Sequence, residues 1–169
     1  MFEWMTKVRY LDSNPLEAVS KPKLLQGADD VSDVELTRAL TRPQMKYVFD
    51  YLHQLPIDAR VARLRFVVAF AYATGLRLSE LANAKTTHLY SAPLKSRLGM
   101  RWMMKVLGKG GKVRPVPMPT RVMLALREYF EFRDADLQGD EYLIGRLNGK
   151  TTSRLDSTII YKLLRDFFK

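Results

Sequence analysis

Residues 58–83 read DARVARLRFVVAFAYATGLRLSELAN, and they include the longest apolar run of the chain, residues 66–73. Apolar side chains occupy nearly every side of a helix here, so the sequence predicts a helix over about residues 58–73 at the centre of the core. Gly75 suits the left-handed position that ends a helix. A short second helix is expected to follow over about residues 77–83.

Further helices are expected on both sides of this stretch. Thr41-Arg42-Pro43-Gln44 has the pattern of a capping box, with a hydroxyl at the helix start and Gln44 three residues later. A helix is therefore predicted to begin there and to end before Pro56. Amphipathic patterns predict two more helices, over about residues 119–132 and 156–168.

A β-hairpin is predicted around Gly110-Gly111, because the apolar pattern changes to a period of two over residues 101–117. The two glycines supply the positive φ angles that a tight turn requires. If they alone form the loop, Lys109 and Lys112 lie opposite each other, and an anion nearby would relieve the repulsion between them.

The second strand of this hairpin is expected at the edge of a sheet, because Pro115 and Pro117 cannot donate a backbone hydrogen bond to a neighbouring strand. Leu89-Tyr90 is expected to add a third strand. The predicted fold class is α+β: mainly α-helical, with a small antiparallel three-stranded sheet.

The net charge of +10 arises from one segment of the chain. Residues 81–127 contain no acid and ten of the 28 Lys and Arg residues, and the other 18 bases balance the 18 acids. Such a concentrated positive field favours a polyanionic partner, with nucleic acid first and an anionic membrane second. The alternative is a solvated basic face without a polyanionic partner.

Composition excludes several other classes of function. The chain has no cysteine, so a thiolate nucleophile, a disulfide framework and a Cys-based zinc site are excluded. The eight-residue apolar run at 66–73 is far shorter than the roughly 20 residues that span a bilayer. The first residues show no signal-peptide pattern, so no membrane partner is expected.

Two segments carry residues that are suited to binding phosphate. Arg77 sits at the start of a predicted helix, where a guanidinium can hold two phosphate oxygens, although pairing with Glu80 is the simpler alternative. Lys109, Lys112 and Arg114 surround the predicted hairpin turn. The alternative for these three residues is a solvated tip without a ligand.

Together these segments resemble the tyrosine recombinase family, which includes phage integrases and the Xer-type recombinases. Residues 73–81, ATGLRLSEL, are similar to the family's first arginine box, and residues 106–117, VLGKGGKVRPVP, are similar to its lysine-bearing hairpin. The resemblance extends from about Leu40 to the C-terminus. It implies that residues 37–169 are the N-terminal portion of a catalytic domain, preceded by a linker over 21–36 and the end of a core-binding domain over 1–20.

The resemblance also implies a chemistry and site residues. In this family a tyrosine attacks a DNA phosphodiester without metal, ATP or another cofactor. Arg77 corresponds to a catalytic arginine that clamps the phosphate, Lys109 to the lysine that protonates the leaving oxygen, and Glu80 to an acid that supports Arg77. The residues expected to contact DNA are Lys112, Arg114, Lys105 and Arg101.

The implied partners are double-stranded DNA and, for a full-length parent, other recombinase protomers in a synaptic complex. The implied location is the cytoplasm, in association with the nucleoid, for a bacterial or phage-encoded protein.

The chain also departs from the family pattern. Its two histidines, His53 and His88, are not followed by arginine three residues later, so the His-x-x-Arg box is missing. Tyr161 lies within a predicted helix, where a structural role is expected rather than that of the nucleophile. The expectation is therefore a truncated, monomeric domain that binds DNA without cutting it. The alternatives are a non-catalytic DNA-binding remnant or regulator, and a basic scaffold that binds a protein through Tyr129, Phe130 and Phe132.

Overall fold

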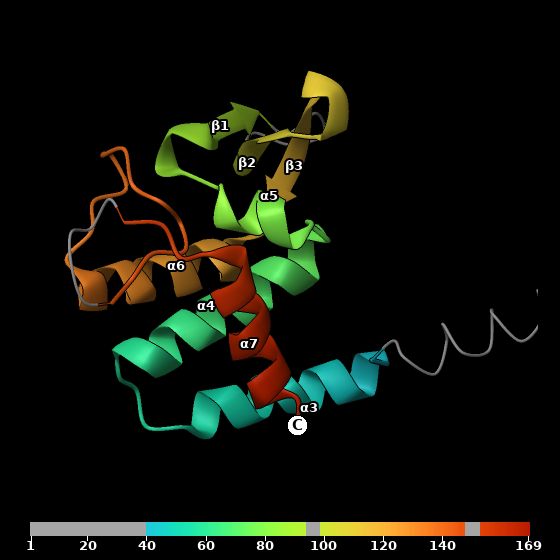
Figure 1. Cartoon of the computed structure of the whole chain (residues 1–169), viewed down its shortest axis with the longest axis vertical. Coiled ribbons are helices and arrows are strands. Elements are labelled where there is room, and N and C mark those ends of the chain that lie inside the picture. Colours follow the sequence, from blue (N-terminus) through green and yellow to red (C-terminus); the bar gives the residue numbers. More distant parts are fainter. Residues whose placement is uncertain (1–39, 94–98, 148–152) are drawn as a thin grey trace, which may run out of the picture. The chain divides into compact units, whose positions relative to one another are not determined.

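A computed structural model describes residues 40–93, 99–147 and 153–169 (Figure 1). The chain divides into two compact units, Met1–Met45 and Lys46–Lys169, and the account below concerns mainly the second. The predictions for 1–20 and 21–36 lie outside the described residues. The helices are α3 (Arg42–Gln54), α4 (Ala59–Thr74), α5 (Leu78–Ala82), α6 (Thr120–Arg133) and α7 (Ser157–Phe167), the strands are β1 (Leu89–Pro93), β2 (Met100–Leu107) and β3 (Val113–Met118), and 3-10 turns cover Thr86–His88 and Lys109–Gly111.

The central position predicted for α4 is confirmed. Asp58 begins the helix by accepting a 2.7 Å hydrogen bond from the Val61 N–H, and Gly75 ends it at φ 59°. Phe66 is completely buried, and its ring stacks on the ring of Tyr129 in α6. The capping box at the start of α3 is confirmed too, since the Gln44 side chain accepts from the Thr41 N–H at 2.8 Å.

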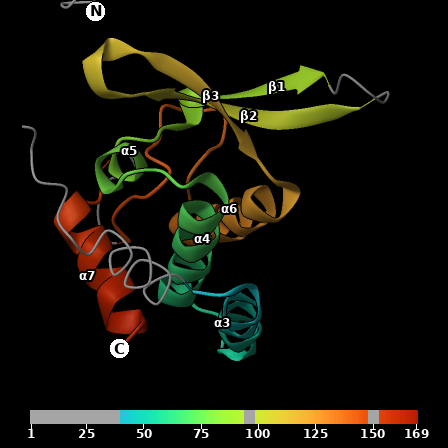
Figure 2. The same cartoon turned by 90° about the vertical axis from the view of Figure 1, so that its right-hand side faces the viewer.

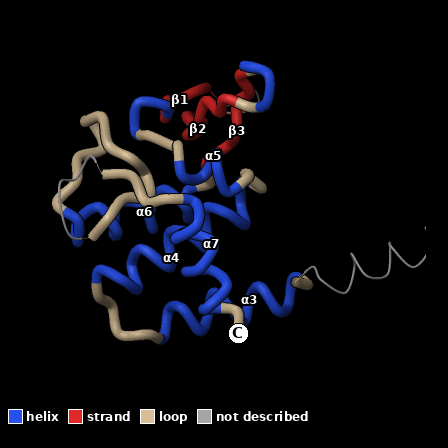
Figure 3. The backbone as a smooth tube through the Cα atoms, viewed as in Figure 1, coloured by secondary structure: helices blue, strands red, loops and turns tan. Residues whose placement is uncertain are grey.

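The predicted α+β class is also confirmed, with three antiparallel strands in the order β1-β2-β3. Figures 1 and 2 show the sheet at one end of the helices, with α5 between the sheet and α7, and Figure 3 shows that the described strands all lie in this one region. The edge position of β3 and the extra strand at Leu89-Tyr90 are confirmed, although β1 continues to Pro93.

The turn of the hairpin differs from the sequence prediction. Leu107 pairs with Val113, and the Gly108 N–H donates to the Lys112 carbonyl at 2.8 Å. Lys112 therefore lies opposite Gly108, and the expected direct opposition of two lysines across a two-residue loop is wrong. Lys109 belongs to a three-residue turn with Gly110 (φ 76°) and Gly111 (φ 75°).

Burial of the sheet explains the longer turn. Met104 and Val106 of β2 face the core together with Val116 and Met118 of β3. A loop shorter by one residue would shift the register by one and turn the buried side chains of β3 to solvent. The apolar face of the sheet therefore selects three residues in the turn.

A buried polar assembly holds the segment that follows α6. The guanidinium of Arg133 donates to the Tyr142 carbonyl at 2.7 Å and pairs with Glu141 at 3.1 Å. The Tyr129 hydroxyl donates to the Gly145 carbonyl at 2.9 Å. The same segment is joined to the chain just after α5, where the Leu143 N–H donates to the Ala84 carbonyl at 2.8 Å.

Among the residues that the structure describes, no helix combines the length and apolar character needed to cross a membrane.

Candidate functional site

Glu80, in the first turn of α5, is the centre of the candidate site. Its side chain is only 6% exposed. Arg114 reaches it from β3 with two parallel hydrogen bonds, Nη1 to Oε1 and Nη2 to Oε2, both 3.0 Å long. The backbone N–H of Arg77 donates to Oε2 at 2.9 Å. A glutamate three residues after the residue that precedes a helix is well placed to accept that N–H, which explains this local arrangement.

Arg77 points largely into solvent. Its backbone is extended just before α5, and its side chain is 70% exposed. The Nη1 atom lies 3.6 Å from Glu80 Oε1, which is an ion-pair distance but too long for a hydrogen bond. Glu80 thus holds the backbone of Arg77 more closely than its guanidinium, and the donors of that guanidinium face outward.

The hairpin turn lies beside this cluster. A Cβ atom placed on Gly108 would lie 3.2 Å from Arg114 Nη1 and 4.0 Å from Glu80 Oε1. The backbone of Lys109 follows directly in the chain, whereas its side chain lies outside the described part of the structure. Folding therefore brings the two segments predicted from the sequence, around Arg77 and Lys109, into one neighbourhood.

The residues expected to contact DNA are divided between the two faces of the sheet. Arg114 pairs with Val106 in the sheet and lies on the core side, where it reaches Glu80. Lys105 and Arg101 occupy alternate positions of β2 and face the other side. There the Lys105 ammonium lies 5.6 Å from the centre of the Tyr90 ring. Lys112 is exposed at the end of the turn.

Further polar groups near α5 were missed by the sequence reasoning. Asn83 at the end of α5 donates to the Ser79 carbonyl at 2.8 Å, and its Oδ1 accepts from Arg154 at 2.7 Å. A hollow of about 260 Å³ separates α5 from β2, and His88 lines it together with Glu80. Burial, and to a lesser extent the charge of Lys85, lowers the pKa of His88. The sequence carries no local signal for the Asn83–Arg154 contact or for the hollow, because both join separate parts of the chain.

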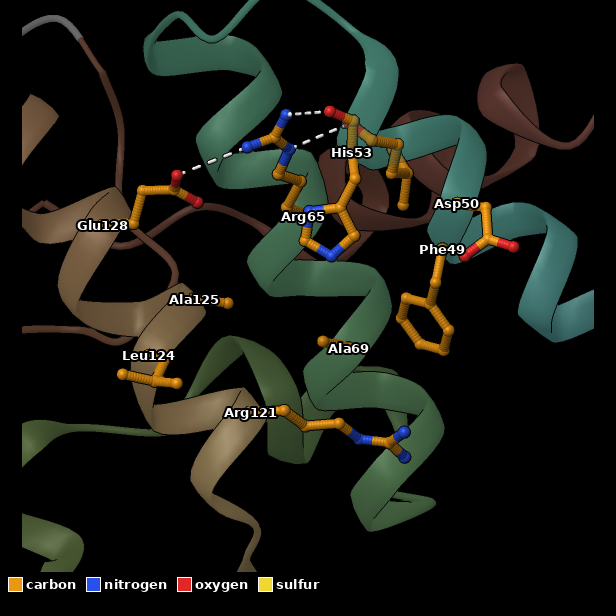
Figure 4. A pocket seen from close by; sticks show the side chains of 10 residues that line it. Phe49, Asp50, His53, Arg65, Ala69, Arg121, Leu124, Ala125 and Glu128 are labelled. Atoms are coloured by element: carbon orange, nitrogen blue, oxygen red, sulfur yellow. Dashed lines mark hydrogen bonds and ion pairs between the residues drawn. The ribbon is translucent and has the colours of Figure 1, made fainter.

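A larger hollow of about 580 Å³ lies elsewhere, between α3, α4 and α6 (Figure 4). At one end Arg65 donates to the Leu52 carbonyl at 2.9 Å and pairs with Glu128 at 3.3 Å. These contacts hold the end of α3 against α4 and α6. None of the residues predicted for phosphate or DNA lines this hollow.

The charge of Glu80 is stabilised in the fold. The hydrogen bonds from the Arg114 side chain, followed by the backbone N–H of Arg77, lower the pKa of Glu80 below its ordinary value of 4.5. The same ion pair raises the pKa of Arg114. Glu80 is therefore an ionised anchor for two arginines, and this state makes it unsuited to proton transfer near neutral pH.

Glu80→Gln should destabilise the protein by about 1–2 kcal/mol at neutral pH, because it removes charge-assisted hydrogen bonds to Arg114. Since the pKa of Glu80 is lowered, its contribution is present above the ordinary carboxyl pKa and is lost as pH falls through the lower pKa of the folded chain. Urea unfolding at neutral pH and at about pH 3 should therefore show the difference from wild type shrinking in acid. Asp50→Asn, which breaks the exposed pair with Lys46, is the control with little expected effect. If the difference in unfolding free energy between Glu80→Gln and wild type stays constant with pH, Glu80 is not an ionised anchor for Arg114.

Most of the chain is similar to known proteins. The family model described as the phage integrase family matches residues 38–167. The chain is 32% identical over 140 residues to tyrosine recombinase XerC of Ralstonia pickettii (strain 12J), which covers 78% of this chain and 38% of that protein. It is 30% identical over 155 residues to tyrosine recombinase XerC of Xanthomonas axonopodis pv. citri (strain 306), and this match covers 90% of this chain and 44% of that protein.

A solved structure shares the fold. The crystal structure of XerH site-specific recombinase bound to difH substrate, a pre-cleavage complex, superposes with a TM-score of 0.58 at 20% identity, covering 76% of this chain and 35% of that one. The chain thus spans less than half the length of the relatives it matches.

Proposed function

Because this chain belongs to the phage integrase family, we propose that it binds duplex DNA and contributes Arg77 and Lys109 to a site that breaks and rejoins a DNA strand through a phosphotyrosine intermediate. The observation that carries this proposal is the Glu80–Arg114 ion pair, which joins the start of α5 to the base of the hairpin. The relatives are named tyrosine recombinases, and the XerH site-specific recombinase is bound to its difH substrate.

Arg77 would act on the phosphate at which the strand is cut. The transition state of phosphodiester cleavage by an oxygen nucleophile carries extra negative charge on the non-bridging oxygens. A guanidinium offers two parallel hydrogen bonds to such oxygens, and a donor of this kind is commonly worth about 10²–10³ in rate. The 70% exposure of the Arg77 side chain leaves it accessible to a DNA backbone.

Lys109 would supply the proton for the departing 5′-oxygen, a general-acid role that requires close approach to that oxygen. A turn with two glycines at positive φ can follow the backbone of a duplex closely, since glycine has no side chain to obstruct it. Lys112 and Arg101 are proposed as phosphate contacts that add affinity, and Lys105 belongs to the same group.

We also propose an arrangement of domains and partners for this chain. Residues 37–169 would form the N-terminal portion of the catalytic domain, after a linker over 21–36 and the end of a core-binding domain over 1–20. The partners would be double-stranded DNA and other recombinase protomers. The protein would act in the cytoplasm, on the DNA of a bacterium or phage.

DNA binding is the direct test. Fluorescence anisotropy with a labelled duplex should give a Kd below about 10⁻⁴ M at physiological salt, and log K should fall linearly with log salt. Absence of binding in this range would refute the proposal.

A nicked suicide substrate tests the cleavage step. These 169 residues contain no His-x-x-Arg box, so we expect no covalent protein–DNA product from them. Tyr161 is 51% exposed on α7, which makes Tyr161→Phe the matched variant. A covalent product that disappears in Tyr161→Phe would overturn the expectation that Tyr161 is structural.

A further inference from the structure

Arg77 lies beside a carboxylate that would compete with phosphate for its donors. The Glu80 side chain is 6% exposed, and Arg77 Nη1 is 3.6 Å from its Oε1 atom. A buried carboxylate requires hydrogen-bonded positive charge, because leaving it without compensation is strongly destabilising. Without another cation, the 3.6 Å gap would close into a tight Arg77–Glu80 pair.

Arg114 removes this competition in the structure. Its two terminal nitrogens each lie 3.0 Å from a different oxygen of Glu80. The parallel geometry is the strongest pairing available to a carboxylate, and it satisfies Glu80 from the side of β3. As a result the Arg77 guanidinium stays outside this pair, 70% exposed.

We propose that Arg114 is a positioning residue, which saturates Glu80 and thereby keeps the guanidinium of Arg77 available to a phosphate. This role differs from the phosphate contact expected for Arg114 from the sequence, because each terminal nitrogen directs one hydrogen bond to Glu80. The role of phosphate as the ligand of Arg77 rests on the proposed function. The release of Arg77 from Glu80 does not, and it is measurable without DNA.

The first experiment is a thermal-unfolding cycle without DNA. In the wild-type background Arg77→Gln should change Tm little, because within the described residues the Arg77 side chain has one ion pair, the long 3.6 Å contact with Glu80. In the Arg114→Gln background Arg77 becomes the remaining partner of Glu80. There Arg77→Gln should lower Tm by about 2–4 °C more than in wild type. Equal shifts in the two backgrounds would overturn the proposal.

The second experiment measures the salt slope of duplex binding. Arg77→Gln should reduce the slope of log K against log salt by about 0.9, the value of one phosphate contact. Arg114→Gln should produce a similar loss, because Glu80 then captures Arg77. The double variant Glu80→Gln with Arg114→Gln removes the competing carboxylate and should restore the wild-type slope.

The outcomes separate the possible roles of Arg114. A double variant as impaired as Arg114→Gln would show that Arg114 contacts DNA itself, and an unaffected Arg114→Gln would show that Arg77 needs no protection; either result overturns the proposal. Arg60→Gln, an exposed charge at the other end of α4, controls for the loss of one positive charge. If the wild-type chain binds no DNA, the proposed function fails, and the thermal cycle still decides the inference.

Arg114→Lys covers the case in which Arg114→Gln does not fold. Lysine keeps the charge but cannot hold both carboxylate oxygens in parallel, so one oxygen of Glu80 is released towards Arg77. We expect a smaller loss of salt slope than in Arg114→Gln, again restored by Glu80→Gln. A loss that Glu80→Gln does not restore would contradict the positioning role.

Discussion

Replacing Arg133 with methionine is expected to lower the free energy of unfolding by about 3–5 kcal/mol, because it leaves a buried carboxylate without its partner. The Arg133 side chain is only 1% exposed and the Glu141 side chain 11%. The guanidinium also donates to the Tyr142 carbonyl at 2.7 Å and lies 5.4 Å from the centre of the Phe130 ring. Methionine would fill part of the space and satisfy none of these polar groups.

Urea unfolding of the two proteins measures this effect, with Arg127→Met as the control. Arg127 lies on the same helix and is exposed, so its loss should change stability by less than about 0.5 kcal/mol. A second variant disturbs the assembly without removing charge: a Cβ on Gly145 would overlap Arg133 Cζ, so Gly145→Ala must displace the guanidinium. Equal stability of Arg133→Met and Arg127→Met would show that the buried pair is unimportant.

The double variant Lys109→Ala with Lys112→Ala should have the largest effect on DNA binding. Each phosphate contact contributes about 0.9 to the slope of log K against log salt, so the slope should fall by about 1.8. Raising the salt concentration from 50 to 200 mM should therefore weaken DNA binding by the variant roughly tenfold less than DNA binding by the wild type. The physical reason is that fewer condensed counterions are released when two cations of the hairpin are absent.

Anisotropy titrations at several salt concentrations measure the slope. Lys46→Ala with Arg60→Ala removes the same charge from exposed positions on α3 and α4 and is the matched control. The double variant Arg101→Ala with Lys105→Ala removes two positive charges from the sheet face opposite Arg114. Comparing its salt slope with that of the hairpin variant identifies the face that the duplex covers. If the hairpin variant keeps the wild-type slope, the hairpin does not touch DNA.

Local patterns in the sequence were sufficient to predict helix α4 and the β-hairpin. The apolar stretch from Val61 to Ala71 predicts the buried helix α4, and Gly75 predicts its end, because both depend only on residues adjacent in the chain. The alternation around Gly110-Gly111 predicts a hairpin for the same reason. The length of its turn could not be predicted from the two glycines alone, since it depends on which face of the finished sheet is buried.

In the candidate site, too, some features follow from the local sequence and others depend on the packed fold. Sequence alone determined that Arg77 stands at a helix start three residues before Glu80 and that Lys109 lies next to two turn-forming glycines. Only the tertiary structure decided that Arg114, 34 residues from Glu80, would hold that carboxylate, and that Arg133 would be buried with Glu141. A side chain selects a partner by its distance in space, and that distance follows from strand register and helix packing summed over the whole core. The local sequence specifies the elements and their charges, whereas the packed fold specifies which charges meet.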